Sequence, residues 1–194
     1  KETADETYTE FTPYNNYDIT KHVIDLLVER SDIEYYGLRF GTVNGIAPIV
    51  RTDVMINAMF EHSKKNGEII LYSKDIMRPI LGINDLVRAI KTIIDTKEDK
   101  RGIYNLASFN KTAEEIAYSV SKATNTPVIE LNTVPNQVIT NYKLQSTAYN
   151  FKINTDKFKT AFNFEFKDTI QSIVKTLQSK SYISTVRTDY KPYE

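Results

Sequence analysis

The 194-residue chain has no cysteine and only two histidines, His22 and His62. The absence of thiols excludes disulfide bonds, thiolate metal sites and a cysteine nucleophile. Two histidines cannot make a three-histidine metal site, and neither belongs to a His-Glu-x-x-His motif, so we expect no bound metal. Glycine is also scarce: six residues make up about 3% of the chain, against a usual share of roughly 7%.

Net charge and long apolar runs are absent as well. The 25 Lys and Arg residues balance 25 Asp and Glu residues, which argues against a broad surface for nucleic acid or anionic membranes. The apolar runs, such as Ile24–Val28 with Asp25 inside, are too short to span a bilayer, and Lys1–Glu10 is polar, unlike a secretory signal. With 41% hydrophobic and 26% charged residues, we expect a globular, cytoplasmic protein.

Apolar spacing predicts helices that alternate with short strands, which is typical of an α/β protein with parallel pairing. The first sixteen residues are expected to form a loop. Four predicted helices are Asp18–Arg30, which has one buried side, Arg51–Lys65, Thr155–Phe162 and Asp168–Gln178. A fifth begins at a cap formed by Asn84 or Asp85. A sixth begins at a capping box of Thr112 and Glu115 and runs through Thr124. The predicted strands are Ile33–Val43, Glu68–Tyr72, Arg78–Ile83, Ile103–Leu106 and Val128–Leu131, and Val134–Ala148 is expected to be irregular.

Two Tyr-x-x-x-Lys pairs occur, Tyr17 with Lys21 and Tyr118 with Lys122. On a helix the two side chains share a face, and a nearby ammonium lowers the pKa of a phenol from its usual value near 10. Such a phenol can exchange a proton with a substrate while a hydride moves to or from a nicotinamide. About one such pair is expected by chance from the composition. Either pair by itself is therefore interpreted as a surface lysine beside a half-buried tyrosine, unless its context indicates chemistry.

Context comes from motifs that occur in a fixed order. They are Tyr14–Lys21 followed by Gly37–Gly45, then Arg51–Asn57, Met77–Ile90, Gly102–Leu106 and Asn154–Phe164. Together they resemble the extended short-chain dehydrogenase/reductases, the NAD-dependent epimerases and dehydratases of nucleotide sugars. Tyr118 falls in a helix that carries no chemistry in this family, so we interpret that pair as structural.

The resemblance implies the C-terminal part of a Rossmann-like, doubly wound parallel sheet plus a small mixed α/β substrate-binding lobe. Residues 1–50, with a strand near 80–106 returning to them, would belong to the dinucleotide-binding part. Residues 51–180 would form mainly the substrate lobe, and residues 181–194 a tail. The resemblance also implies a homodimer through the Asp18–Arg30 helix.

By the same resemblance, Tyr17 is the general acid/base, and Lys21 is its partner and a ligand of the cofactor ribose. Phe40 and Gly41 would lie at the nicotinamide end of NAD or NADP. Thr42 stands where relatives often carry an asparagine that contacts the sugar or the diphosphate of the nucleotide-sugar substrate.

Two further substrate contacts follow from the resemblance. Asn57 would contact the diphosphate region, and the Arg78 guanidinium would pair with the diphosphate. The alternatives are a helix-surface amide for Asn57 and a surface cation for Arg78. We interpret Asp85 as a helix N-cap. We expect Arg51 to flank a helix start in solvent, and the alternative is that Arg51 also reaches the anion.

The chain departs from the family in what it lacks. None of its six glycines has the Gly-x-x-Gly-x-x-Gly spacing that lets a helix N-terminus approach a pyrophosphate. Relatives often place a second phosphate-binding arginine near Tyr149–Phe151, where Lys152 is the nearest cation. We therefore expect a portion of a longer protein that binds NAD poorly by itself; a micromolar dissociation constant for this chain would contradict that.

Three functions remain open from sequence. The leading one is an NAD(P)-dependent epimerase, dehydratase or reductase of a nucleotide sugar. The second is a non-catalytic nucleotide- or sugar-binding regulatory protein on the same fold, because function resides in the site and not in the fold. The third is an assembly role through the Asp18–Arg30 helix.

Overall fold

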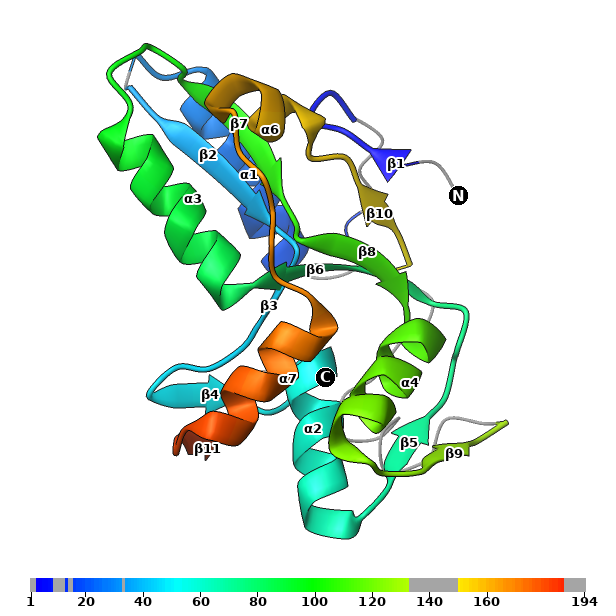
Figure 1. Cartoon of the computed structure of the whole chain (residues 1–194). Coiled ribbons are helices and arrows are strands. Elements are labelled where there is room, and N and C mark those ends of the chain that lie inside the picture. The colour runs from blue at the N-terminus through cyan, green and yellow to red at the C-terminus, as the bar shows by residue number, and fades with distance from the viewer. Residues whose placement is uncertain (1–2, 9–12, 14–15, 33, 133–149, 187–194) are drawn as a thin grey trace.

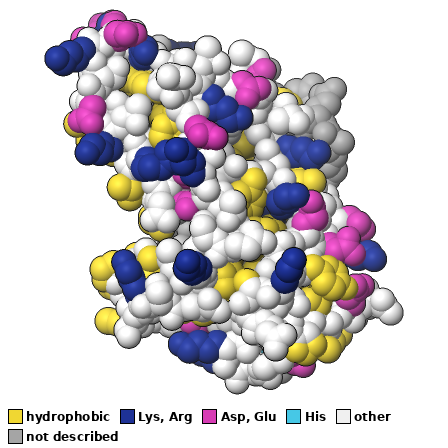
Figure 2. All heavy atoms as spheres, in the orientation of Figure 1, with side chains coloured by type: hydrophobic (Ala, Val, Ile, Leu, Met, Phe, Trp, Pro, Cys, Tyr) yellow, Lys and Arg dark blue, Asp and Glu magenta, His cyan; other side chains and the backbone are white. Residues whose placement is uncertain are grey.

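The computed structural model describes residues 3–8, 13, 16–32, 34–132 and 150–186. It is a mixed α/β fold whose strands pair mostly in parallel. Figure 1 shows two lobes, one above and one below the strand β6 (Met77–Gly82). Figure 2 shows acidic and basic side chains interspersed on the face it presents. Within the described ranges, no helix has the length and apolar character needed to cross a bilayer.

The upper lobe is built on two parallel strands. Strand β2 (Tyr36–Phe40) pairs along its whole length with β7 (Gly102–Leu106). Helix α1 (Asn16–Glu29) lies behind this pair in Figure 1, and α3 (Ile83–Asp95) lies beside it. The two parallel strands thus direct their carboxyl ends toward the junction of the lobes.

An aromatic cluster forms the core of the upper lobe. Helix α6 (Asp156–Phe162) supplies Phe158 and Phe162, and both rings make edge contacts with Tyr104 of β7 at 5.7 and 5.3 Å between centroids. Edge-to-face geometry at this spacing adds to the free energy of apolar burial. Phe158 has no exposed surface, so α6 is anchored to the upper lobe although residues 51–180 were assigned mainly to the substrate lobe.

The lower lobe has a separate aliphatic core. Helices α2 (Met55–Asn66), α4 (Ala113–Thr124) and α7 (Ile170–Ser179) pack around it. Two pairs of short parallel strands border the helices: β5 (Ile69–Leu71) with β9 (Val128–Glu130), and β4 (Ile49–Arg51) with β11 (Ile183–Thr185). The segment interpreted as a tail therefore contributes a strand to this lobe.

The central strand β6 joins the two cores. It pairs in parallel with β3 (Thr42–Asn44) and antiparallel with β8 (Phe109–Thr112). Its neighbouring residues point in opposite directions, as strand geometry requires, so Ile80 packs in the lower core and Leu81 in the upper one. A last parallel pair joins β1 (Thr3–Ala4) to β10 (Lys152–Ile153).

Several local predictions are confirmed and others are wrong. The capping box of Thr112 and Glu115 is present. The predicted strand Ile33–Val43 is two strands, β2 and β3, that separate at Gly41, and β1 lies within the predicted N-terminal loop. The irregular segment Val134–Ala148 lies outside the described residues. The proposed domain limits at residues 50 and 180 stay a prediction.

The N-cap assignment of Asp85 is wrong, because α3 begins at Ile83 after an extended Gly82. Asp85 is fully buried in the first turn and accepts hydrogen bonds from the backbone N–H groups of Lys167 and Asp168. Its carboxylate thus joins α3 to the segment before α7.

The expectation of a buried side on α1 is also wrong for the described chain. None of its residues is buried, and five apolar side chains remain more than one third exposed: Ile19, Val23, Ile24, Leu26 and Leu27. Apolar periodicity shows that a helix face favours burial, but it does not show that the covering partner lies in the same chain.

Candidate active site

A cavity of about 1040 Å³ lies where the two lobes meet. Six of the seven side chains or backbones assigned to the site from sequence line it: Tyr17, Phe40, Gly41, Thr42, Asn57 and Arg78. These residues come from α1, the end of β2, β3, α2 and β6, so the fold brings together segments separated by up to 60 residues. Lys21 does not line the cavity itself.

Tyr17 and Lys21 lie on consecutive turns of α1. The Lys21 ammonium is 5.2 Å from the centroid of the Tyr17 ring, as the i, i+4 spacing predicts. Tyr17 is 45% exposed, so its phenol is accessible from the cavity. The contact shown is of the cation–π kind, which holds the ammonium next to the phenol.

Phe40 and Gly41 mark the point where the chain passes from β2 to β3. The Phe40 ring is 48% exposed at the cavity, whereas Gly41 donates its N–H to Leu106 O at 2.8 Å. A β-carbon at Gly41 would lie 2.9 Å from Pro79 O, closer than real contacts allow. Glycine here lets β3 turn away from β2 and pass directly against β6.

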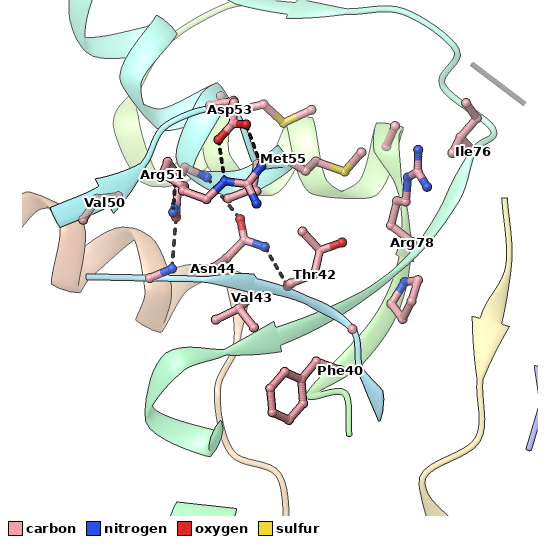
Figure 3. A pocket seen from close by; sticks show the side chains of 18 of the residues that line it. Phe40, Thr42, Val43, Asn44, Val50, Arg51, Asp53, Met55, Ile76 and Arg78 are labelled. Carbon is pink, nitrogen blue, oxygen red and sulfur yellow. Dashed lines mark hydrogen bonds and ion pairs between the residues drawn. The ribbon is translucent and has the colours of Figure 1, made fainter. Parts of the chain in front are cut away.

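Thr42 is the first residue of β3, and Arg78 projects from the neighbouring strand β6. Figure 3 shows the two side chains on the same side of the strands, both directed into the cavity. Arg78 thus supplies a cation, and Thr42 a hydroxyl, to one space.

Asn57 is 3% exposed, and its amide binds the backbone. Its Oδ1 accepts the Gly45 N–H at 3.0 Å, and its Nδ2 donates to Arg51 O at 3.0 Å. These bonds attach α2 to the ends of β3 and β4. The alternative of an amide on the outer surface of the helix is wrong, whereas a contact with substrate stays a prediction.

Asn44 is a site residue that sequence reasoning missed. It is 1% exposed, and its Oδ1 accepts from the Ile56 and Asn57 N–H groups at 3.0 and 3.3 Å. Its Nδ2 donates to Thr42 O at 2.9 Å. Asn44 thereby caps α2, whose own N-cap residue, Val54, has no side-chain acceptor. No local motif signals this, because the capping residue lies 10 positions upstream on another element.

Arg51 lies where it was predicted, and its side chain is 48% exposed. It ends β4 just before α2, as expected, but its side chain lines the cavity. Its guanidinium forms a two-bond fork with Asp53, with Nε–Oδ1 at 2.9 Å and Nη2–Oδ2 at 2.6 Å. The guanidinium is therefore fixed in direction.

His62 also lines the cavity, but both of its ring nitrogens have partners nearby. Nδ1 lies 2.9 Å from Glu68 O and Nε2 lies 3.0 Å from Asn66 Nδ2. These contacts favour a structural role for this histidine. In the described part of the chain, no group of three or more metal-binding side chains gathers.

The residues present fit only one end of a dinucleotide. Tyr17, Lys21 and the exposed Phe40 ring can meet a ribose and a flat ring. At Gly41 the space beside the α-carbon is occupied by the Pro79 backbone. No glycine of the sequence belongs to a Gly-x-x-Gly-x-x-Gly turn. The residues present are thus compatible with the nicotinamide end of a dinucleotide, and the sequence contains no glycine turn for its pyrophosphate.

Fold and cavity together define an α/β protein with mostly parallel strands. Tyr17, from the helix that also holds Lys21, and Arg78, from β6, meet at one cavity between the lobes. A family model described as the NAD dependent epimerase/dehydratase family matches residues 1–107. The chain belongs to the NAD dependent epimerase/dehydratase family.

Solved structures share the fold. UDP-glucuronic acid 4-epimerase from Bacillus cereus matches with a TM-score of 0.70 at 16% identity, covering 91% of this chain and 55% of that one. ADP-L-glycero-D-manno-heptose-6-epimerase from Helicobacter pylori matches with a TM-score of 0.70 at 17% identity, covering 92% and 55%. dTDP-glucose 4,6-dehydratase from Bacillus anthracis matches with a TM-score of 0.66 at 18% identity, covering 91% and 57%. The chain therefore spans about half the length of these structures.

Proposed function

We propose that this chain is the substrate-facing portion of an NAD(P)-dependent epimerase or dehydratase of a nucleotide sugar, with Tyr17 as its general acid/base. The observation that carries the proposal is the single cavity that Tyr17, Phe40, Thr42 and Arg78 line together. Among the similar structures, the Bacillus cereus epimerase was crystallised with UDP-glucuronic acid and NAD.

In the proposed reaction, Tyr17 moves a proton at its phenol oxygen. Lys21, whose ammonium lies 5.2 Å from the centroid of the Tyr17 ring, is the partner of Tyr17 on the next turn of α1. The phenolate takes a proton from a sugar hydroxyl, and the phenol returns it in the reverse step. Bound NAD or NADP would supply hydride acceptance and donation at the Phe40–Gly41 end.

The opposite side of the cavity binds and orients the substrate in this proposal. The planar guanidinium of Arg78 can donate two parallel hydrogen bonds to diphosphate oxygens. Thr42 offers a hydroxyl that both donates and accepts, which suits a sugar hydroxyl or a phosphate oxygen. Asn57 fixes the backbone of Gly45 and Arg51, so it supports this wall of the cavity.

The test is Tyr17→Phe in the protein that combines this chain with a complete cofactor-binding half. Turnover should fall by about a hundredfold or more, the usual contribution of a positioned acid/base, with an unchanged circular dichroism spectrum. Tyr118→Phe is the matched control, because Tyr118 also has a lysine four residues later but bonds Glu130 outside the cavity. Equal turnover in the two variants would refute the role of Tyr17.

We also propose a homodimer through α1. The exposed apolar side chains Ile19, Val23, Ile24 and Leu27 are 43–64% exposed, and burying such a surface against a second copy is favourable. Leu27→Glu should shift the sedimentation coefficient at micromolar concentration from dimer to monomer. A wild-type protein that sediments only as a monomer would contradict the proposal.

A further inference from the structure

We infer that Asn66 is a site of spontaneous deamidation, at which the backbone nitrogen of Gly67 converts the side-chain amide into a carboxylate. Two of the six glycines follow an asparagine, Gly45 after Asn44 and Gly67 after Asn66. Glycine makes this reaction least hindered, because no β-carbon crowds the attacking nitrogen. The two pairs carry the same local signal in the sequence, so their surroundings in the fold decide which of them reacts.

The reaction balances within the dipeptide and one water molecule. The nitrogen of Gly67 gives up its proton and forms a bond with Cγ of Asn66. The bond from Cγ to Nδ2 breaks, and ammonia leaves with that proton. Water then opens the cyclic imide at either of its carbonyl groups. One product is aspartate, and the other is isoaspartate, in which the main chain runs through the former side-chain carbonyl.

Asn66 and Gly67 lie in an accessible turn where α2 ends. Figure 1 shows this turn at the bottom of the lower lobe. Both residues are exposed, and a β-carbon at Gly67 would meet no atom within 4 Å. The Gly67 N–H donates to Ser63 O at 3.0 Å, so the attack requires this last helical bond to open. Bonds at helix ends open at little cost in free energy, and solvent then reaches both reacting groups.

Asn44 and Gly45 are held in the opposite way. Asn44 is 1% exposed, and its Oδ1 accepts two backbone N–H groups of α2 while its Nδ2 donates to Thr42 O. The Gly45 N–H donates to Asn57 Oδ1 at 3.0 Å. The amide of Asn44 can reach the nitrogen of Gly45 only when the cap of α2 is lost, and water has little access there. The fold therefore protects this pair.

The change at Asn66 reaches the cavity between the lobes through His62, which lines it. His62 Nδ1 lies 2.9 Å from Glu68 O, which can only accept, so Nδ1 carries the proton of the neutral ring. Nε2 then accepts from Asn66 Nδ2 at 3.0 Å. A carboxylate has no proton to donate, so its contact with Nε2 requires a proton on that nitrogen. Deamidation thus exchanges the donor that holds His62 for an acceptor.

The experiment follows both asparagines in one sample of the 194-residue chain. The folded protein is incubated in mildly alkaline buffer, and mass spectrometry of its peptides measures the conversion of each Asn-Gly pair. Asn66 should convert at least about tenfold faster than Asn44, because a helix end opens more often than a buried cap. In urea, where the fold is lost, the two pairs should convert at similar rates. Gly67→Ala should slow the conversion of Asn66 in the folded chain by about tenfold or more, since its β-carbon crowds the nitrogen.

Equal conversion of Asn44 and Asn66 in the folded chain would overturn the inference. So would an Asn66 that converts in urea but not in the folded chain, because the bond to Ser63 would then protect it. Asn66→Asp makes the aspartate product directly and tests the link to the cavity by nitrogen-15 spectra of the His62 ring. Nε2 should carry a proton in this variant and none in the wild type, and an unprotonated Nε2 in the variant would overturn that link.

Discussion

The cap that Asn44 places on α2 should be worth a large part of the stability of the lower lobe. Asn44→Ala removes the acceptor of the Ile56 and Asn57 N–H groups and the donor to Thr42 O, in a position that is 1% exposed. The alanine methyl group can replace none of these bonds. Water has little access to satisfy the groups left behind.

The magnitude follows from the three lost bonds. A cap deletion costs about 1 kcal/mol, and each further buried group left without a partner adds about 1 kcal/mol at the low end of its range. The expected loss is therefore about 3 kcal/mol. With a urea dependence of about 2 kcal/mol per molar, the unfolding midpoint should fall by about 1.5 M.

The assay is urea unfolding of the 194-residue chain followed by far-ultraviolet circular dichroism. Asn66→Ala is the control, because Asn66 lies on the same helix and is exposed. The described hydrogen bond of its side chain is with His62 Nε2. That variant should change the free energy of unfolding by less than about 0.5 kcal/mol. If Asn44→Ala and Asn66→Ala unfold at the same midpoint, the cap does not stabilise the lobe and the reasoning fails.

Two other predictions concern glycines and pH. Gly82→Ala should lower stability by at least about 2 kcal/mol, because its β-carbon would overlap the Asp168 carboxylate. Gly67→Ala, with φ of 72° and open space around it, should cost only about 1 kcal/mol. Thermal melting of both variants checks that Gly82→Ala lowers the melting temperature more than Gly67→Ala does. A larger drop for Gly67→Ala would contradict the prediction. The Lys111 hydrogen bond lowers the pKa of Glu115 below its ordinary value of 4.5. Its stabilisation is therefore present above that value and lost as the pH falls through the lower folded pKa. Glu115→Gln should cost about 0.3 kcal/mol at pH 7 and nothing at pH 2 by urea unfolding, since an exposed pair contributes little.

Elements with a local signal could be predicted well. The box of Thr112 and Glu115 is contained in four residues, and α4 begins where it predicts. By contrast, Asp85 carries the usual sign of an N-cap but lies buried inside α3, because the distant N–H groups of Lys167 and Asp168 need its oxygens. A local sequence pattern cannot show that backbone N–H groups more than 80 residues away need this carboxylate as their acceptor.

The candidate site likewise contains residues whose relation is local in sequence and residues whose position depends on distant contacts. Tyr17 and Lys21 form a pair within one helix, so their relation is visible in the sequence, and their contact at 5.2 Å follows from helical spacing. The position of Arg51 depends instead on its fork with Asp53, on Asn57 and on a strand that returns near residue 185. The sequence therefore predicts the flanking position of Arg51 before α2, whereas tertiary contacts place its side chain at the cavity.

The buried amides of Asn44, which sequence reasoning missed, and Asn57, which it assigned to substrate, share one property: both bond backbone on another element. Asn44 caps a helix from a neighbouring strand, and Asn57 holds the ends of two strands from within that helix. Because each amide both donates and accepts, the two residues lock β3, β4 and α2 into one unit. Thr42 and Arg51 are carried on that unit. The hydrogen bonds of Asn44 and Asn57 therefore hold together the elements that bring Thr42 and Arg51 to the cavity.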